Sequence, residues 1–208
     1  MSRIATVAEL ESRYRPPAGR VRTKKRDRLD DGLRTILAAS PFVLLATADA
    51  DGRCDVSPRG GPPGFVKALD DRHVAVPDLN GNNLLDSLRN VVTNPHAGLL
   101  VVVPGQHETL RIDGPAHLSD DDDVLDLFVD ELRRPVLAIV VETAAVFTHC
   151  AKSFRRGRVW EPASWPEPER PLMLDARYRQ LGLDVSFEEY AADNAAKIAA
   201  GLSADAPT

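Results

Sequence analysis

Cysteine is scarce in this chain: Cys54 and Cys150 are the only two among 208 residues. They form no CxxC pair, so the sequence predicts neither a disulfide framework nor a zinc site built from cysteines. No apolar run approaches the roughly 20 residues that a membrane-spanning helix requires, and the N-terminus lacks the apolar core of a signal peptide. We therefore expect a cytoplasmic protein with reduced thiols and no membrane partner.

Charge and motif content leave several other function classes without support. The net charge is −5, whereas a general nucleic-acid binder carries a basic footprint, so no nucleic-acid partner is expected. The basic run Arg20 to Arg28 is interrupted by Asp27 and is typical of a solvated arm. No Walker loop, GxGxxG or GxSxG motif occurs, and the five histidines are scattered without metal-binding spacing. An NTPase, a Rossmann enzyme, a serine hydrolase and a metal centre are therefore not expected.

Short apolar runs joined by tight turns predict an antiparallel β structure. Phe42–Ala48 and Arg53–Ser57 flank an Asp51-Gly52 turn, which is a hairpin signal. Further strands are expected over residues 65–69, 73–76, 98–103, 109–116 and 136–147. Several short strands of this kind favour a barrel over a parallel α/β sheet.

Helices are predicted where apolar residues recur at helical spacing or capping signals occur. The expected ranges are 6–14, 28–39, 82–93, 121–132 with Ser119 as N-cap, and 186–200 with a Ser186/Glu189 capping box. The resulting fold class is mainly β (α+β). We expect N-terminal helices and a basic arm over residues 1–40 and a β-barrel domain over 41–160. Residues 161–208 would form a Pro-rich loop and a helix that packs on the barrel or on a partner.

Hydrogen-bond donors and cations recur where these apolar elements end. They are Ser57, Arg59, Lys67, Asn82, Asn83, Ser87 and Arg89. A helix that starts near Asn82 would offer its first N–H groups to a phosphate. Ser57-Pro58-Arg59 leads into a loop rich in glycine and proline, which could hold the face of a planar ring. The pattern suits a flat anionic ligand, but it also fits a helix that is merely capped by Asn82 and an ordinary surface loop.

Four segments carry a resemblance to a known family. They are LATADADGRCDVSPRGGPPGFVKALDD, VPDLNGNNLLDSLRN, NPHAGLLVVVPGQHETLRIDGPA and FTHCAKSFRRGRVW, in this order from about Phe42 to Trp160. In order and spacing the chain resembles the pyridoxamine 5'-phosphate oxidase-related, FMN-binding split-barrel superfamily. Within it, the chain is most similar to a branch of uncharacterised bacterial flavoproteins.

This resemblance implies a six-stranded Greek-key split barrel that forms a homodimer and binds FMN between its subunits. Residues 41–160 would then be the FMN-binding domain. Ser57, Pro58 and Arg59 would lie along the isoalloxazine ring and the ribityl chain, and Lys67 would lie near the flavin or its phosphate. The phosphate end would be served by Asn82, Asn83, Ser87 and Arg89. Arg111 and Lys152 would come from later elements, of the same or of the other subunit.

The chain departs from the pattern of this branch at two positions. Leu84 stands where an arginine usually follows GNN, and Gly157 stands where a serine usually follows arginine. Loss of one phosphate cation weakens FMN binding by roughly one to two decades if nothing replaces it. Both departures favour loose FMN occupancy or another flavin-like ligand.

Three functions follow from the resemblance. The first is an FMN-dependent oxidoreductase that acts on an unknown small molecule. The second is a non-catalytic flavin-binding or sensing protein, and the third is a reductase that uses a deazaflavin coenzyme. Pyridoxamine 5'-phosphate oxidase activity itself is not expected, because the C-terminal arginine/histidine signature for the substrate phosphate is missing.

Overall fold

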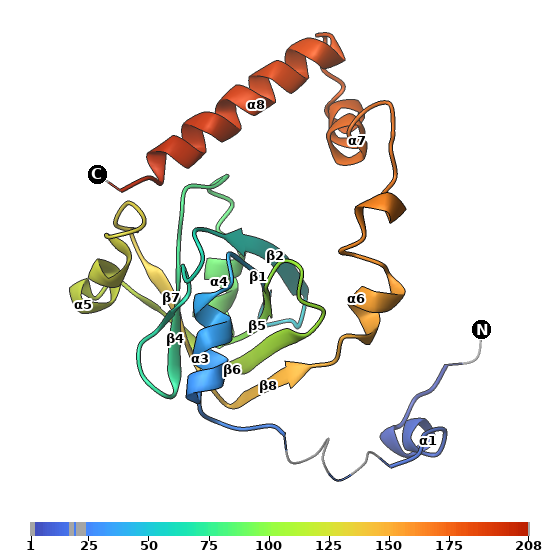
Figure 1. The fold of residues 1–208 in the computed structure, drawn as a ribbon, viewed down its shortest axis with the longest axis vertical. Helices are drawn as coiled ribbons and strands as arrows, with labels where there is room; N and C mark the ends of the chain where they lie inside the picture. Colours follow the sequence, from blue (N-terminus) through green and yellow to red (C-terminus); the bar gives the residue numbers. More distant parts are fainter. Residues whose placement is uncertain (1–2, 17–18, 20–23, 208) are drawn as a thin grey trace.

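An antiparallel sheet forms the centre of the computed structural model, which describes residues 3–16, 19 and 24–207 (Figure 1). In these residues the sheet contains eight strands, all paired antiparallel. They are β1 (Phe42–Ala48), β2 (Cys54–Gly60), β3 (Lys67–Ala68), β4 (His73–Pro77), β5 (His96–Val102), β6 (Thr109–Ser119), β7 (Ala138–Glu142) and β8 (Ala145–His149). The expected antiparallel class is confirmed.

The long strand β6 divides this sheet into two halves. The strand order is β2-β1-β5-β6-β7-β4-β3, and β8 also pairs with β6. One edge of β6 pairs with β8 over residues 109–113 and with β7 over residues 116–119. The same strand therefore belongs to both halves, and the sheet splits where β6 exchanges one partner for the other.

Gly114 occupies the point on β6 at which this exchange takes place. A Cβ atom at Gly114 would lie 1.7 Å from the carbonyl oxygen of Glu142 and 2.9 Å from the amide nitrogen of Ala144. The Ala144 N–H donates to the Asp113 carbonyl at 2.8 Å, which holds the β7–β8 turn against β6. Only glycine fits here, because the backbone of the turn takes the space of a side chain.

The expected number of six strands was wrong. The run over residues 136–147 is two strands, since the chain turns at Thr143 and Ala144 where it passes Gly114. The run over residues 65–69 keeps only the two-residue strand β3. Both differences are local breaks in apolar runs, which hydrophobic patterning alone does not reveal.

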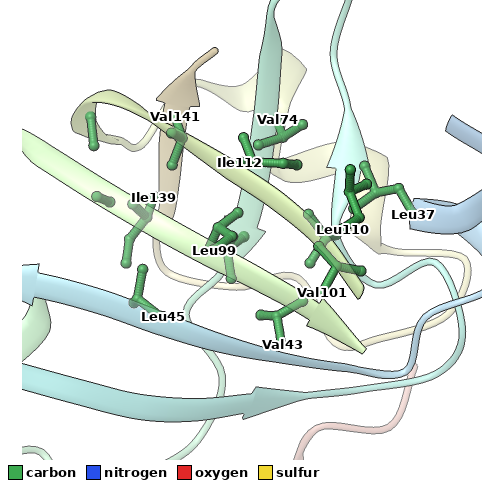
Figure 2. Close-up of a cluster of buried hydrophobic side chains, with 14 of the residues drawn as sticks. Leu37, Val43, Leu45, Val74, Leu99, Val101, Leu110, Ile112, Ile139 and Val141 are labelled. Carbon is green, nitrogen blue, oxygen red and sulfur yellow. The ribbon is translucent and has the colours of Figure 1, made fainter. Parts of the chain in front are cut away.

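Alternating side chains of the strands form one main hydrophobic core (Figure 2). Val43 and Leu45 of β1 point into it, together with Leu99 and Val101 of β5, and all four are fully buried or nearly so. The helix α3 (Asp31–Ala38) contributes Leu37 to the same cluster. Its N-cap Asp30 accepts a hydrogen bond from the Leu33 N–H at 3.0 Å, so capping and burial both stabilise this helix.

The remaining helices lie around the sheet and along the C-terminal arm. They are α1 (Val7–Glu11), α4 (Asp86–Thr93), α5 (Asp122–Leu125), α6 (Lys152–Arg156), α7 (Leu172–Leu181) and α8 (Phe187–Ala204), with the 3₁₀ turns η1 (Asp126–Phe128) and η2 (Pro162–Ser164). In the described part of the chain, no helix is both long enough and apolar enough to cross a membrane. The arm formed by α6, α7 and α8 arcs around the outside of the barrel, and the end of α8 returns to it (Figure 1).

Two helix predictions need correction, and two helices, α6 and α7, were not predicted. The helix expected over residues 82–93 starts at Asp86. The helix expected over residues 121–132 ends at Leu125, continues as η1, and is capped by Asp121, because Ser119 still belongs to β6. The helix α7 was not predicted, since its apolar residues do not form one buried stripe. The Ser186/Glu189 capping box of α8 is confirmed, and residues 20–23 of the expected basic arm lie outside the described residues.

We predict that Gly114→Ala destabilises the fold severely. The new methyl group would overlap the turn between β7 and β8, at a cost of about 3 kcal/mol or more in the free energy of unfolding. Urea denaturation monitored by circular dichroism measures the loss. Gly32→Ala, inside α3, is the matched control and should stabilise by roughly 0.5–1 kcal/mol. Equal stability of the Gly114→Ala variant and the native protein would contradict this account of the split sheet.

Candidate functional site

The strand β2 presents two chemically different faces. Asp55, Ser57 and Arg59 are half-buried, whereas Val56 and Pro58 between them are exposed. Ser57 and Arg59 are opposite Leu45 and Val43 of β1, which point into the core. The polar residues therefore lie on the inner side of the sheet, because side chains alternate along a strand.

A chain of hydrogen bonds links these residues to α4. The Ser87 hydroxyl donates to Asp55 Oδ2 at 2.8 Å and lies 3.1 Å from the Ser57 hydroxyl. The Arg59 Nε–H donates to Ser57 Oγ at 3.3 Å. A hydroxyl group has a single proton, and that of Ser87 is used on Asp55, so Ser57 is the donor to Ser87. The chain of donors thus runs from Arg59 through the two serines to the Asp55 carboxylate.

Asp78, at the end of β4, brings a second carboxylate to Arg59. Arg59 Nη1 lies 3.4 Å from Asp78 Oδ1, and both side chains are largely buried. Burial raises the pKa of the Asp78 carboxyl above its ordinary value of 3.8, and the nearby Arg59 offsets only part of this effect. Ionisation of Asp78 is therefore less favourable in the folded protein than in the unfolded chain.

The loop before α4 has an unusual backbone. Asn83 and Leu85 have φ angles of 57° and 61°, in the left-handed region that residues other than glycine rarely adopt. The Asn82 side chain accepts a hydrogen bond from the Leu84 N–H at 3.1 Å and so forms a local turn. Strain of this kind in a loop is a common feature of binding sites.

The helix that we expected to start near Asn82 begins at Asp86, so its first N–H groups do not lie at Asn82. Leu85 is the N-cap residue of α4 and makes no side-chain capping bond, and Asp86 occupies the first turn. Asn82 therefore caps no helix. The Asp86 carboxylate already complements the positive end of the helix dipole.

A cavity of about 220 Å³ opens between β2, the loop and α4. It is lined by Asp55, Ser57, Arg59, Asp78, Leu79, Gly81, Asn82, Asn83, Leu84, Leu85, Asp86, Ser87 and Leu88. A groove of about 440 Å³ adjoins it and shares Ser57, Arg59 and Asn82 with it. We call the two hollows, which share these lining residues, the β2–α4 site.

Half of the ten predicted site residues line the cavity of the β2–α4 site: Ser57, Arg59, Asn82, Asn83 and Ser87. Pro58 lines only the adjoining groove, and Arg89 is exposed on α4. Lys67 forms an ion pair with Glu131 outside the cavity. Arg111 is paired with Asp113 at 3.1 Å on another face of the sheet, and Lys152 is exposed at the start of α6.

The cavity contains three acidic residues that sequence reasoning missed: Asp55, Asp78 and Asp86. Asp55 could have been found from the alternation along β2, which places it on the face of Ser57 and Arg59. Leu84, at the position of the family arginine, lines the cavity and is 59% exposed. No residue lining the described cavity other than Arg59 carries a positive charge.

A third hollow, of about 390 Å³, lies on the outer face of the sheet. Its floor is apolar and comes from Leu44, Ala46, Val56 and Leu100, with Arg111 among the polar residues around it. The strand register places these residues side by side, since Ala46 is opposite Val56 and Leu44 is opposite Leu100, which is itself opposite Arg111. We call this surface the outer sheet face.

Comparison with solved structures finds similar chains of low identity. A putative pyridoxamine 5'-phosphate oxidase from Lactobacillus delbrueckii is 22% identical, has a TM-score of 0.47, and is matched over 60% of this chain and 99% of its own. HupZ from Group A Streptococcus is 13% identical, with a TM-score of 0.48 and coverage of 58% and 93%. An F420 reductase is 17% identical, with a TM-score of 0.37 and coverage of 59% and 97%. TM-scores below 0.5 transfer neither ligand nor activity to this chain.

Comparison of the sequence with family models identifies the family of this chain. No curated protein matches the chain. Residues 29–151 match the family model described as pyridoxamine 5'-phosphate oxidase. This range covers more than half of the 208 residues and contains β1 to β8 and α4. The chain therefore belongs to the pyridoxamine 5'-phosphate oxidase family, within the FMN-binding split-barrel superfamily.

Proposed function

We propose that this protein binds FMN in the β2–α4 site and acts as an FMN-dependent oxidoreductase on a small molecule. The observation that carries the proposal is the chain of donors from Arg59 through Ser57 and Ser87 to Asp55, which lines a cavity in a member of this family. These groups both donate and accept hydrogen bonds. A ligand rich in hydroxyl and phosphate oxygens satisfies such a set.

The residues of the cavity fit the polyol part of FMN well. Ribityl hydroxyls can donate to the Asp55 carboxylate, and the Asn82 and Asn83 side chains offer donors at the loop. At about 220 Å³ the cavity is smaller than the ~300–1,000 Å³ typical of whole-ligand pockets. The isoalloxazine ring would therefore extend into the adjoining groove beside Pro58 and Gly60.

The cavity offers fewer favourable contacts to the phosphate of FMN than to its ribityl hydroxyls. Arg59 is the cation available to it, and Arg59 is already shared with Asp78. Asp86 adds a further negative charge beside the loop. Since Leu84 offers no charge, we expect FMN to bind more weakly than it would with an arginine at that position.

Bound FMN would supply the redox chemistry, and the protein would bind and orient it. Of the two predicted cations, Arg59 lines the site. Lys67 does not line it and forms an ion pair with Glu131. A cation beside the ring stabilises a reduced, anionic flavin. We therefore assign this role to Arg59.

A homodimer would bring two of the remaining predicted residues, Arg111 and Lys152, to the ligand. Arg111 lies by the outer sheet face, where Val56 is 61% exposed beside other apolar side chains. Exposed apolar patches of this kind mark interaction sites. We propose that two copies associate through this face, and that Arg111 and Lys152 of one protomer approach the flavin of the other around the open edge of the sheet at β2.

A deazaflavin coenzyme is the second candidate. The apolar Leu84 and the three carboxylates of the cavity favour a ligand whose charged tail lies outside it. Competition between FMN and a deazaflavin coenzyme for the purified protein distinguishes the two. A flavin-binding or sensing protein without activity would bind FMN but oxidise no nicotinamide donor.

Binding of FMN is tested by quenching of flavin fluorescence. We expect Arg59→Gln to weaken the FMN affinity about 10- to 100-fold, because it removes the cation of the cavity. Arg53→Gln, in the exposed turn between β1 and β2, is the matched control and should bind as the native protein does. A native protein that binds neither FMN nor riboflavin would refute the proposal.

Replacement of Asp78 tests the electrostatics of the same site. The raised pKa means that the folded protein holds this proton more tightly than the unfolded chain, so stability is lost as pH rises from 3.8 through the raised value. Asp78→Asn never ionises and should be more stable than the native protein at pH 7. The difference should vanish well below pH 3.8. Thermal unfolding across pH measures it, with the exposed Asp130→Asn as control.

The proposed dimer is tested by Val56→Glu. A carboxylate on the outer sheet face should dissociate the dimer, because a buried unpaired charge costs several kcal/mol. Multi-angle light scattering gives the mass of each variant. Val136→Glu places the same charge at a valine that is 82% exposed away from this face and should leave the mass unchanged. A monomeric native protein would contradict the dimer.

A further inference from the structure

The C-terminal end of α8 forms part of the β2–α4 site. Leu202 and Asp205 line the groove that adjoins the cavity, as do Arg59 and Asn82. Earlier along its length α8 packs on α7, where Tyr178 contacts the rings of Phe187 and Tyr190. The helix thus reaches from the outer arm back to the barrel, as Figure 1 shows.

Asp205 attaches this end of the helix to the loop of the site. Asp205 Oδ1 accepts a hydrogen bond from the Asn80 N–H at 3.0 Å, and its main-chain carbonyl accepts from the Arg133 N–H at 2.8 Å. One residue therefore joins α8, the loop and the segment after η1.

The loop needs support of this kind. Asn83 and Leu85 are held in the left-handed region, which costs a leucine free energy that its surroundings must offset. The donors Asn82 and Asn83 follow Asn80 closely, so their positions depend on where the Asn80 backbone is held.

We propose that Asp205 is a positioning residue for the ligand site: by holding the Asn80 amide, it keeps Asn82 and Asn83 where they bind the ligand. The C-terminal helix then controls the affinity of a site that is built by β2 and α4. This inference rests on the proposed FMN binding. It adds to the site a residue, Asp205, that is distant in sequence from β2 and α4.

Two variants of Asp205 separate positioning from charge. Asp205→Ala removes the acceptor and should weaken FMN binding about tenfold, as expected for loss of a hydrogen bond to a charged group. Asp205→Asn keeps an acceptor oxygen but removes the negative charge. It should bind FMN as tightly as the native protein, or more tightly, because an anionic ligand gains from loss of a nearby negative charge. Equal weakening in both variants, or native affinity in Asp205→Ala, would overturn the proposal.

Hydrogen exchange of the ligand-free protein gives an independent readout. Asp205→Ala should accelerate exchange of the Asn80 amide and of residues 81–85, whereas Asp205→Asn should not. Asp193→Ala, at an exposed aspartate of the same helix, is the matched control and should change neither exchange nor affinity. If no variant binds FMN but the exchange pattern holds, the proposed ligand is wrong and the role of Asp205 in the loop stands. Unchanged exchange in Asp205→Ala refutes that role.

Discussion

The architecture depends on the close approach of two backbones at Gly114. There β6 leaves one partner strand and takes another, and the turn after β7 passes where a side chain would be. This contact lets one strand serve both halves of the sheet. Because β6 also pairs with β5, and β5 with β1 and β1 with β2, the position of the polar face of β2 follows from it. The position of the β2–α4 site thus depends on a steric constraint that lies several strands away.

Much of the fold can be predicted from the sequence because strands β1 and β2 obey simple rules. The apolar run Phe42–Ala48 is the strand β1 with the predicted bounds, and Gly52 has the positive φ angle that a tight turn before β2 requires. The capping boxes also locate helix starts well, as at Ser186. Prediction fails where the chain changes partners, as at Thr143 and Ala144, because that break comes from a contact with a distant glycine and not from local pattern.

The candidate site is predictable only in part for a related reason. Donors such as Ser57 and Ser87 stand out as polar residues beside apolar runs, and the structure brings them within 3.1 Å of each other. The start of α4 could not be read correctly, because Leu85 adopts a backbone conformation that leucine disfavours. The roles of Asp78 and Asp205 depend on contacts with Arg59 and Asn80 over long sequence separations. Periodicity carries no information about such pairs.

The two faces of β2 differ in polarity, and this difference limits how the sequence can change during evolution. Polar Asp55, Ser57 and Arg59 alternate with Val56 and Pro58, so insertion of one residue in the preceding turn would exchange the two sets. Such a slip would turn apolar groups toward the cavity and charged groups toward the outer surface in a single event. We therefore expect selection against insertions and deletions in that hairpin. Point substitutions on one face of β2 can accumulate independently of those on the other.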